Sequence, residues 1–221
     1  MSIFATLSVY HDVGSRSAAL NMAIDEALLE TAENPTIRFY KWDHPALSFG
    51  YFGKFADVAD QAAERDLVRR WTGGGIVFHG DDLTYSIVIP ASAPAFSESS
   101  MSIYEKIHDA IRAALAANGQ SVELATNGAP RISDSCFGNP VRADVLSNGR
   151  KIAGAAQRRA RGALLQQGSI QDVDLADNFA DQFASELCSE CYQKTLDEGL
   201  ISRAREIAKQ KYGATSWLQR R

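Results

Sequence analysis

The stretch RRWTGGGIVFHGDDLTYSIVIP, Arg69–Pro90, decides how the rest of the chain is interpreted. It predicts a strand, a glycine turn, a second strand, a short acidic turn and a third, longer strand. The three glycines Gly73–Gly75 lack a Cβ atom, so the backbone there can take positive φ and approach a ligand closely. A tight hairpin is the plain alternative, since two glycines between apolar runs favour one.

Two arginines, Arg69 and Arg70, stand directly before these glycines, and a hairpin gives no reason for them. Exposed amides in such a turn already favour an anion. No Gly-Lys-Ser/Thr follows and no helix opens after the glycines, so neither a Walker phosphate loop nor a dinucleotide fingerprint is predicted. We therefore interpret the segment as a loop that cradles a ligand.

The bulk composition excludes several classes of protein. The 221 residues are enough for one large domain with a full core. A formal net charge of −4 gives no reason to expect nucleic acid or an anionic membrane as a partner. No apolar run is long enough to cross a bilayer, the N-terminus MSIFATLSVYHDVG lacks signal-peptide features, and three cysteines do not make a disulfide framework. We expect a cytoplasmic protein with reduced cysteines.

Hydrophobic periodicity predicts a mixture of strands and helices outside the organising stretch. Strands are expected at Phe4–Tyr10, Thr36–Trp42, Ala46–Phe52, Ala143–Leu146, Lys151–Ala155 and Ala163–Ile170. Helices are expected at Ser17–Ala32, Asp57–Leu67, Leu175–Lys194, Leu200–Lys211 and from a capping box at Ser102 to Asn118. Because no regular βαβ rhythm appears, the fold class is α+β, with a mixed, largely antiparallel sheet flanked by helices.

Several polar residues and cysteines receive no chemical role from their positions. Asp25 and Glu26 lie in the first turns of a helix, where the dipole favours acids, and are expected on a solvated face. His108 lies off the apolar stripe of its helix and is also expected to be solvated. Cys188 and Cys191 form a CxxC without a second pair or a following histidine, so core packing is expected and no metal site is predicted.

Two motifs make the sequence resemble a known superfamily. RRWTGGGIVFH and the later GRKIAGAAQRR, Gly149–Arg159, are similar to the signatures of lipoate–protein ligases, octanoyltransferases and biotin ligases. The likeness extends from about Leu20 to about Ile170. It implies the antiparallel-sheet, class II synthetase-like catalytic fold. Because the chain stops soon after its last expected helix, we expect a single catalytic domain over residues 1–221, without the separate C-terminal accessory domain that many lipoate ligases carry. The likeness also implies that the glycine loop wraps the acyl chain and its carboxyl head, and that Lys151 touches the reacting carbonyl.

Further segments resemble the cysteine-dependent octanoyltransferases typical of Gram-positive bacteria. The chain has CFGNP at Cys136–Pro140 and LLQQGSI at Leu164–Ile170. In that branch the matching cysteine carries the acyl group as a thioester, which makes Cys136 the expected nucleophile. Gln167 stands where the branch has histidine. The segment before the lysine resembles instead the RNDV segment of ATP-dependent ligases, whose aspartate, matched here by Asp144, lies near the nucleotide and its metal.

Three functions are therefore weighed. In the first, Cys136 takes an octanoyl group from octanoyl-acyl-carrier protein and passes it to the lysine of a lipoyl carrier domain, of the glycine cleavage H type or the 2-oxoacid dehydrogenase E2 type; this needs no cofactor. In the second, free lipoate is activated with ATP and Mg by a lipoate–protein ligase, with Asp144 near the magnesium or the adenine. In the third, the chain is a non-catalytic subunit that binds lipoyl domains. We favour the first, acting as a monomer.

The expected catalytic residues are Cys136 and Lys151. The expected substrate-binding residues come from the glycine loop, the strands after it and the second motif: Arg69, Arg70, Thr72, Gly73, Gly74, Gly75, Val77, His79, Tyr85, Asp144, Gly154 and Ala155. Val77, Tyr85 and Ile87 are expected to form the apolar wall of an acyl tunnel. Because strand residues alternate between faces, only one of the two arginines can point inward.

Overall fold

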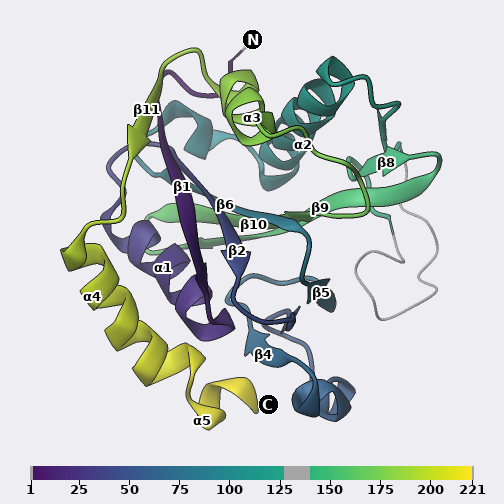
Figure 1. Ribbon diagram of the computed structural model, residues 1–221. Helices are drawn as coiled ribbons and strands as arrows, with labels where there is room; N and C mark the ends of the chain where they lie inside the picture. The colour runs from purple at the N-terminus through teal and green to yellow at the C-terminus, as the bar shows by residue number, and fades with distance from the viewer. Residues whose placement is uncertain (1, 127–139, 221) are drawn as a thin grey trace.

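The structure is a computed structural model that describes residues 2–126 and 140–220 (Figure 1). Its strands of the main sheet are β1 Leu7–Arg16, β2 Thr36–Trp42, β6 Leu83–Pro90, β7 Glu123–Leu124, β8 Val145–Ser147, β9 Arg150–Ala160, β10 Ala163–Ile170 and β11 Cys191–Lys194. They form one eight-stranded sheet in the order β11-β1-β2-β6-β10-β9-β8-β7. β1 pairs in parallel with β2 and β11, and the other pairs are antiparallel. The predicted α+β class with a mixed, largely antiparallel sheet is confirmed.

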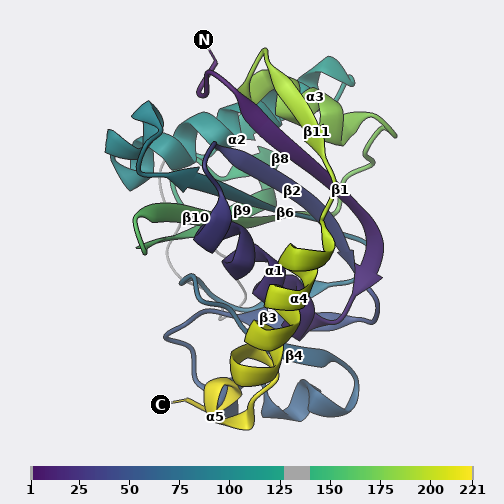
Figure 2. The same ribbon diagram turned by 90° about the vertical axis from the view of Figure 1, so that its left-hand side faces the viewer.

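Helices cover both faces of this sheet (Figures 1 and 2). On one face lie α2, Ser100–Ala117, and α3, Phe179–Leu187; on the other lie α1, Ala18–Thr31, and α4, Glu198–Ile207. After α4 the chain makes a π-helical turn, Ala208–Tyr212, and a short helix α5, Thr215–Leu218. Strand alternation divides the core in two: in β6, Tyr85 and Ile87 join the core beneath α2 and α3, whereas Val88 joins the core beneath α1 and α4.

A second, three-stranded sheet carries the glycine loop. It consists of β3 Ala46–Phe49, β4 Asp66–Arg69 and β5 Val77–His79, in the order β4-β3-β5. β3 is parallel to β4 and antiparallel to β5. Because β3 lies between the two strands that the glycines connect, the hairpin interpretation of the glycines is wrong. The loop instead crosses over the end of β3.

Local sequence signals determine where some helices begin and end, and other helices differ from the predicted ones. Ser17 caps α1, its hydroxyl accepting from the amide of Leu20 at 3.4 Å. The N-cap of α2 is Ser99 rather than Ser102. Short 3-10 turns at Phe55–Asp57 and Ala59–Ala63 replace most of the expected helix Asp57–Leu67.

The expected helix Leu175–Lys194 is wrong at both ends. The helix α3 spans Phe179–Leu187, and Cys188 has an extended backbone, with φ −157° and ψ 139°. The chain then forms β11, which pairs with the edge of β1. The apolar spacing continues through this change, so only pairing with a strand from the opposite end of the chain decides it. Core packing was expected for Cys191, on the apolar stripe, but Cys188 is the residue buried in the core and Cys191 is half-buried against it.

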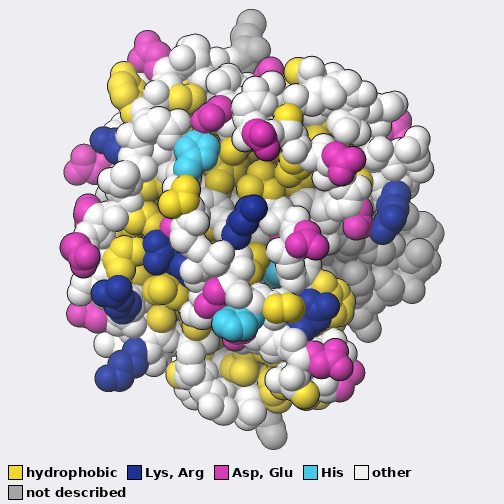
Figure 3. Space-filling model, viewed as in Figure 1, with side chains coloured by type: hydrophobic (Ala, Val, Ile, Leu, Met, Phe, Trp, Pro, Cys, Tyr) yellow, Lys and Arg dark blue, Asp and Glu magenta, His cyan; other side chains and the backbone are white. Residues whose placement is uncertain are grey.

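On the face shown in Figure 3, lysine and arginine side chains are interspersed with aspartate and glutamate. Among the helices of the described residues, none has the length and apolar character needed to cross a membrane.

Candidate active site

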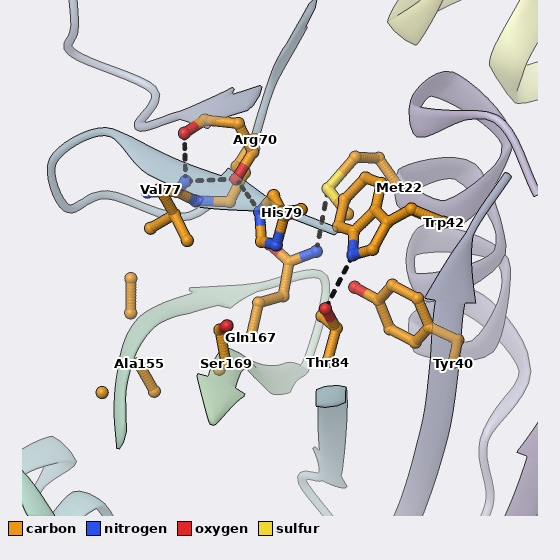
Figure 4. Close-up of a pocket in the computed structure, with 14 residues that line it drawn as sticks. Met22, Tyr40, Trp42, Arg70, Val77, His79, Thr84, Ala155, Gln167 and Ser169 are labelled. Atoms are coloured by element: carbon orange, nitrogen blue, oxygen red, sulfur yellow. Dashed lines mark hydrogen bonds between the residues drawn. The ribbon is translucent and has the colours of Figure 1, made fainter. Parts of the chain in front are cut away.

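A narrow pocket lies between the main sheet and the sheet that carries the glycine loop (Figure 4). Strands of both sheets and helix α1 provide its lining: Met22, Tyr40, Trp42, Ser48, Arg70, Val77, His79, Thr84, Gly154, Ala155, Ala156, Gln167, Gly168 and Ser169. Of the expected substrate-binding residues, this list includes Arg70, Val77, His79, Gly154 and Ala155. The two sequence motifs, far apart in the chain, therefore meet at one cavity.

One guanidinium group and two glycines fix the shape of the glycine loop. The Nη2 atom of Arg70 donates to the carbonyl oxygens of Gly73 and Gly75, at 3.0 and 2.8 Å. Gly74 has φ 86°, in the left-handed region that favours glycine. At Gly50, after β3, an added Cβ would lie 2.1 Å from the carbonyl oxygen of Gly74. The loop thus needs a glycine at a second position, which sequence analysis did not single out.

The neighbouring arginine, Arg69, points away from the pocket. Its guanidinium donates to the carbonyl oxygens of Tyr51 at 2.9 Å and Gly53 at 2.6 Å, after β3, and of Leu218 at 2.9 Å, in the C-terminal helix. It is 1% exposed. Arg69 therefore joins the C-terminal segment to the small sheet, and the structure places Arg70, the next residue, at the pocket.

His79 belongs to a chain of buried polar groups in the pocket wall (Figure 4). Its Nδ1 lies 2.8 Å from Oδ2 of Asp82, and its Nε2 lies 2.6 Å from Oγ of Ser48. Arg70 Nη1 donates to the same Oγ at 2.7 Å. Arginine only donates, so Ser48 accepts from Arg70; because burial disfavours a charged ring, Nε2 of His79 accepts the proton of Ser48. The ring is then neutral and donates from Nδ1 to Asp82, while it stacks on Trp42 at 4.1 Å.

The protonation states in this chain follow from burial and hydrogen bonding. Burial lowers the pKa of His79, against the opposing effect of Asp82. Burial by itself would raise the pKa of Asp82, but hydrogen bonds from His79, Ser169 and Thr84 outweigh it and lower that pKa to about 2. A neutral imidazole beside a carboxylate is thus the stable arrangement.

Lys151 packs against Gly154, one of the pocket-lining residues. Its Nζ lies 2.8 Å from Oδ2 of Asp144, and the two residues are 3% and 0% exposed. The hydroxyl of Tyr104 donates to Oδ1 of the same carboxylate at 2.6 Å. A Cβ at Gly154 would lie 2.3 Å from Cε of Lys151, so this glycine makes room for the lysine. A buried ammonium group is therefore held beside the pocket.

The expected nucleophile, Cys136, lies outside the described residues. The described residues that flank its segment contact Asp144. The amide of Val141 donates to Oδ2 of Asp144 at 2.7 Å, and the amide of Ala125 donates to its carbonyl oxygen at 2.8 Å.

Asp25 and Glu26 are buried, at 0% and 2% exposed, so their expected solvated positions are wrong. Asp25 Oδ1 accepts from Arg38 Nη1 at 2.9 Å, and Glu26 accepts from the hydroxyl of Tyr212 at 2.7 Å. The main sheet covers α1 on one side, and α4 with the following turn covers it on another. The argument from the helix dipole assumed an exposed helix, and this helix is enclosed.

Gln167 connects the glycine loop to this enclosed helix. Its Oε1 accepts from Thr72 Oγ1 at 2.9 Å, and its Nε2 donates to Asp25 Oδ2 at 2.7 Å and to the sulfur of Met22 at 3.2 Å. Thr72 is fully buried and does not line the pocket. The residue that departs from the transferase pattern thus has both ends of its amide engaged.

Tyr85 and Ile87 lie on the face of β6 opposite to the pocket. The Tyr85 ring packs on Gly168, where an added Cβ would lie 2.3 Å from it, and makes an edge contact with Phe183 at 5.3 Å. Thr84, the preceding residue, lines the pocket instead. The expected tunnel wall at Tyr85 and Ile87 is therefore part of the α2 and α3 core.

His108 is 0% exposed, so its expected solvated position is wrong. Its Nδ1 lies 2.7 Å from the carbonyl oxygen of Ala143, in the chain just before β8. The apolar stripe of α2 faces the sheet, but β7 and β8 cover a second side of this helix. A single stripe could not reveal that second contact.

Sequence analysis gave no site role to nine lining residues from α1 and the strands: Met22, Tyr40, Trp42, Ser48, Thr84, Ala156, Gln167, Gly168 and Ser169. A signal was present for two of them, since alternation in Thr36–Trp42 places Tyr40 and Trp42 on one face of the strand. Within the described ranges, no group of three or more His, Cys, Asp or Glu side chains is arranged to hold a metal ion.

A family model described as the lipoyl protein ligase A/B catalytic domain matches residues 17–205. The octanoyltransferase LipM of Oceanobacillus iheyensis is 41% identical over 164 residues, which cover 70% of this chain and 60% of that protein. The octanoyltransferase LipM of Kyrpidia tusciae is 37% identical over 206 residues, 86% of this chain and 75% of that protein. This chain thus spans less than two thirds of the first relative.

The fold has a counterpart among solved structures. A bipartite lipoate protein ligase from Thermoplasma acidophilum, described together with its E2 lipoyl domain, superposes with a TM-score of 0.72 at 21% identity, over 98% of this chain and 96% of that chain. At this identity the likeness concerns the fold alone, and it confirms the lipoate-ligase type of catalytic fold expected from the motifs. The family match spans most of the chain, and on that ground the protein belongs to the lipoyl protein ligase A/B catalytic domain family.

Proposed function

We propose that the protein transfers an octanoyl group from octanoyl-acyl-carrier protein to the lysine of a lipoyl carrier domain, through a thioester on Cys136. The observation that carries the proposal is the buried ammonium group of Lys151, held by Asp144 beside a narrow pocket lined by both sequence motifs. Similarity to two octanoyltransferases, at 41% and 37% identity, supports this chemistry. The E2 lipoyl domain described with the Thermoplasma ligase supports a lipoyl domain as the acceptor.

The reaction has two steps. The thiolate of Cys136 attacks the donor thioester, the carrier thiolate leaves, and an acyl-enzyme forms. The acceptor amine then attacks the acyl-enzyme, an amide bond forms, and the proton lost by the amine is taken up by the departing cysteine sulfur. In both steps the ammonium group of Lys151 donates a hydrogen bond to the carbonyl oxygen as negative charge develops there. Gly154, which lines the pocket and packs against Lys151, lies at the head-group end of the acyl site.

The arrangement of Asp144 favours this function over an ATP-dependent ligase. In the ligase hypothesis this aspartate lies near a magnesium ion or the adenine. Here its carboxylate is fully buried, with Oδ1 bound by Tyr104 and Oδ2 bound by Lys151 and the amide of Val141. These oxygens are already engaged within the protein, so the residues fit a metal poorly. A non-catalytic role in binding lipoyl domains would leave the buried Lys151 pair without a purpose.

Intact-protein mass spectrometry tests the proposal. The enzyme is mixed with octanoyl-acyl-carrier protein without ATP, and we expect a mass gain of one octanoyl group that hydroxylamine removes. Cys136→Ala should lack the adduct, while Cys191→Ser, a matched change of a half-buried cysteine, should retain it. Acylation of a lipoyl domain only with free lipoate, ATP and magnesium, without any adduct, would show a ligase instead.

A further inference from the structure

The backbone just before Asp144 has an unfavourable conformation. Ala143 has φ 67°, in the left-handed region where a residue with a Cβ atom costs about 1–2 kcal/mol. Its amide donates to the carbonyl oxygen of Ala125 at 2.8 Å, and its own carbonyl oxygen accepts from His108 at 2.7 Å. These hydrogen bonds hold the peptide groups on both sides of Ala143, and the bond from His108 orients the peptide group between Ala143 and Asp144.

The protonation state of His108 follows from its partners. A carbonyl oxygen only accepts, so Nδ1 of His108 carries the proton. Burial lowers the pKa of His108 to about 4, with Asp144 opposing and Lys151 supporting the change, so the ring is neutral. Its Nε2 then has a buried lone pair with no partner in the part of the chain that the structure describes. Burying an unsatisfied acceptor costs free energy, so a residue chosen for packing alone would be apolar here.

Tyr104 lies one helical turn before His108, on the same side of α2. The two rings meet edge to face, with centroids 4.0 Å apart. The Tyr104 hydroxyl donates to Oδ1 of Asp144 and accepts from the amide of Ala155 at 3.1 Å. Ala155 lines the pocket. One side of α2 therefore contacts the backbone before Asp144, the carboxylate itself and the pocket wall.

We propose that His108 and Tyr104 are positioning residues, which hold Asp144 so that the ammonium group of Lys151 stays aligned with the reacting carbonyl. The inference rests on the proposed role of Lys151. His108 acts on the backbone through Ala143, and Tyr104 acts on the carboxylate. Neither touches the acyl group. Because they set the position of a charge that matters in the transition state, their loss lowers kcat and leaves donor binding largely intact.

Three variants test His108. In His108→Leu the ring and its donor are lost, and we expect kcat to fall about 10- to 100-fold while KM for octanoyl-acyl-carrier protein changes less than about threefold. His108→Asn keeps an N–H donor near the position of Nδ1 and should retain most of kcat. A glycine at position 143 adopts the left-handed conformation without strain and does not need the hydrogen bond from His108. The double variant His108→Leu with Ala143→Gly should therefore regain a large part of the lost kcat.

Tyr104→Phe keeps the ring and removes the hydroxyl, and we expect a fall of about tenfold in kcat. Thermal unfolding of every variant shows how much enzyme is folded. An unchanged kcat in His108→Leu and Tyr104→Phe would overturn the proposal. A fall in kcat that only matches the loss of folded enzyme, and that Ala143→Gly does not reverse, would overturn it as well. If the wild type acylates lipoyl domains only with lipoate and ATP, the transferase proposal is wrong. The same variants are then compared in the ligase reaction, where Lys151 stabilises the adenylate, so the positioning role of His108 and Tyr104 is tested independently.

Discussion

Two buried carboxylate–cation pairs in this protein look alike and differ in what surrounds them. Beneath α1, Arg38 is 0% exposed and donates to Asp25 at 2.9 Å, to Asp12 at 2.7 Å and to Asn21 at 2.7 Å. Beside α2, Lys151 pairs with Asp144 at 2.8 Å. The planar guanidinium is fixed by several oxygens at once, whereas the ammonium group ends a flexible chain next to a pocket-lining glycine. Both pairs are buried and both contact pocket-lining residues, Gln167 for Asp25 and Gly154 for Lys151. What separates them is the cation: the guanidinium is fixed in place, whereas the ammonium group can move.

The largest effect should come from breaking the pair beneath α1. Asp25→Ala leaves Arg38 buried with one fewer carboxylate, and we expect the free energy of unfolding to fall by about 3–5 kcal/mol. Urea unfolding measures it, with the exposed Asp177→Ala as a control that should change by less than about 0.5 kcal/mol. A loss below about 1 kcal/mol for Asp25→Ala would mean that the network is not structural.

The pair beside α2 should respond in activity. Lys151→Arg keeps the charge but replaces a compact ammonium group with a planar fork, and we expect kcat to fall about 10²- to 10³-fold, equivalent to about 2.7–4 kcal/mol. The free energy of unfolding should fall less than in Asp25→Ala. The matched change Arg38→Lys should lower the free energy of unfolding more than it lowers kcat, because lysine cannot donate to three partners in fixed directions. Equal losses of stability in both variants would remove the distinction between the pairs.

Acid should lower the free energy of unfolding through His108, which lies on α2. Its pKa is about 4 in the folded state against 6.5 for an unperturbed histidine, and the groups facing it are Tyr104, Asp144 and Lys151. The unfolded chain takes up a proton that the folded ring refuses, so this contribution is complete above pH 6.5 and is lost as the pH falls through about 4. Between pH 7.5 and pH 5 it amounts to about 2 kcal/mol.

Comparison with His108→Asn isolates this contribution, since the pKa of His79 is also lowered and acts in the same direction. Asp82, with a pKa of about 2, loses its contribution only below the usual carboxylate range. If wild type and His108→Asn lose the same stability between pH 7.5 and pH 5, His108 does not titrate as its burial implies.

The smallest expected effect separates two glycines with similar crowding. Gly154→Ala meets the flexible end of Lys151 at 2.3 Å, so the lysine moves, kcat falls about tenfold and stability changes little. Gly168→Ala meets the rigid ring of Tyr85 at the same distance, so the free energy of unfolding falls by about 1–3 kcal/mol. Parallel thermal unfolding and kcat measurements on both variants check this, and a large loss of stability in Gly154→Ala would contradict it.

Much of the fold was predictable because its signals are local. Thr36–Trp42 and Ala163–Ile170 were placed with their observed ends, since alternation over a buried strand needs no knowledge of distant partners. Asn148 and Gly149, with φ 50° and 75°, form the turn between β8 and β9, and these two residue types are typical of such a turn. Of the expected site, Arg70, Val77 and His79 line the pocket together with the second motif. Cys136 stays a prediction.

The sequence by itself determined the strand and helix periods, the glycine loop and the two motifs that meet at the pocket, because each depends on residues close together in the chain. Only the tertiary structure decided that Arg70 and not Arg69 faces the pocket, that Asp25 and His108 are buried, and that Cys191–Lys194 is a strand. Those outcomes depend on partners far away in sequence: a covering helix, a facing carbonyl or an open strand edge. A polar residue is stable in the interior only when such partners exist, and one amphipathic stripe carries no information about them.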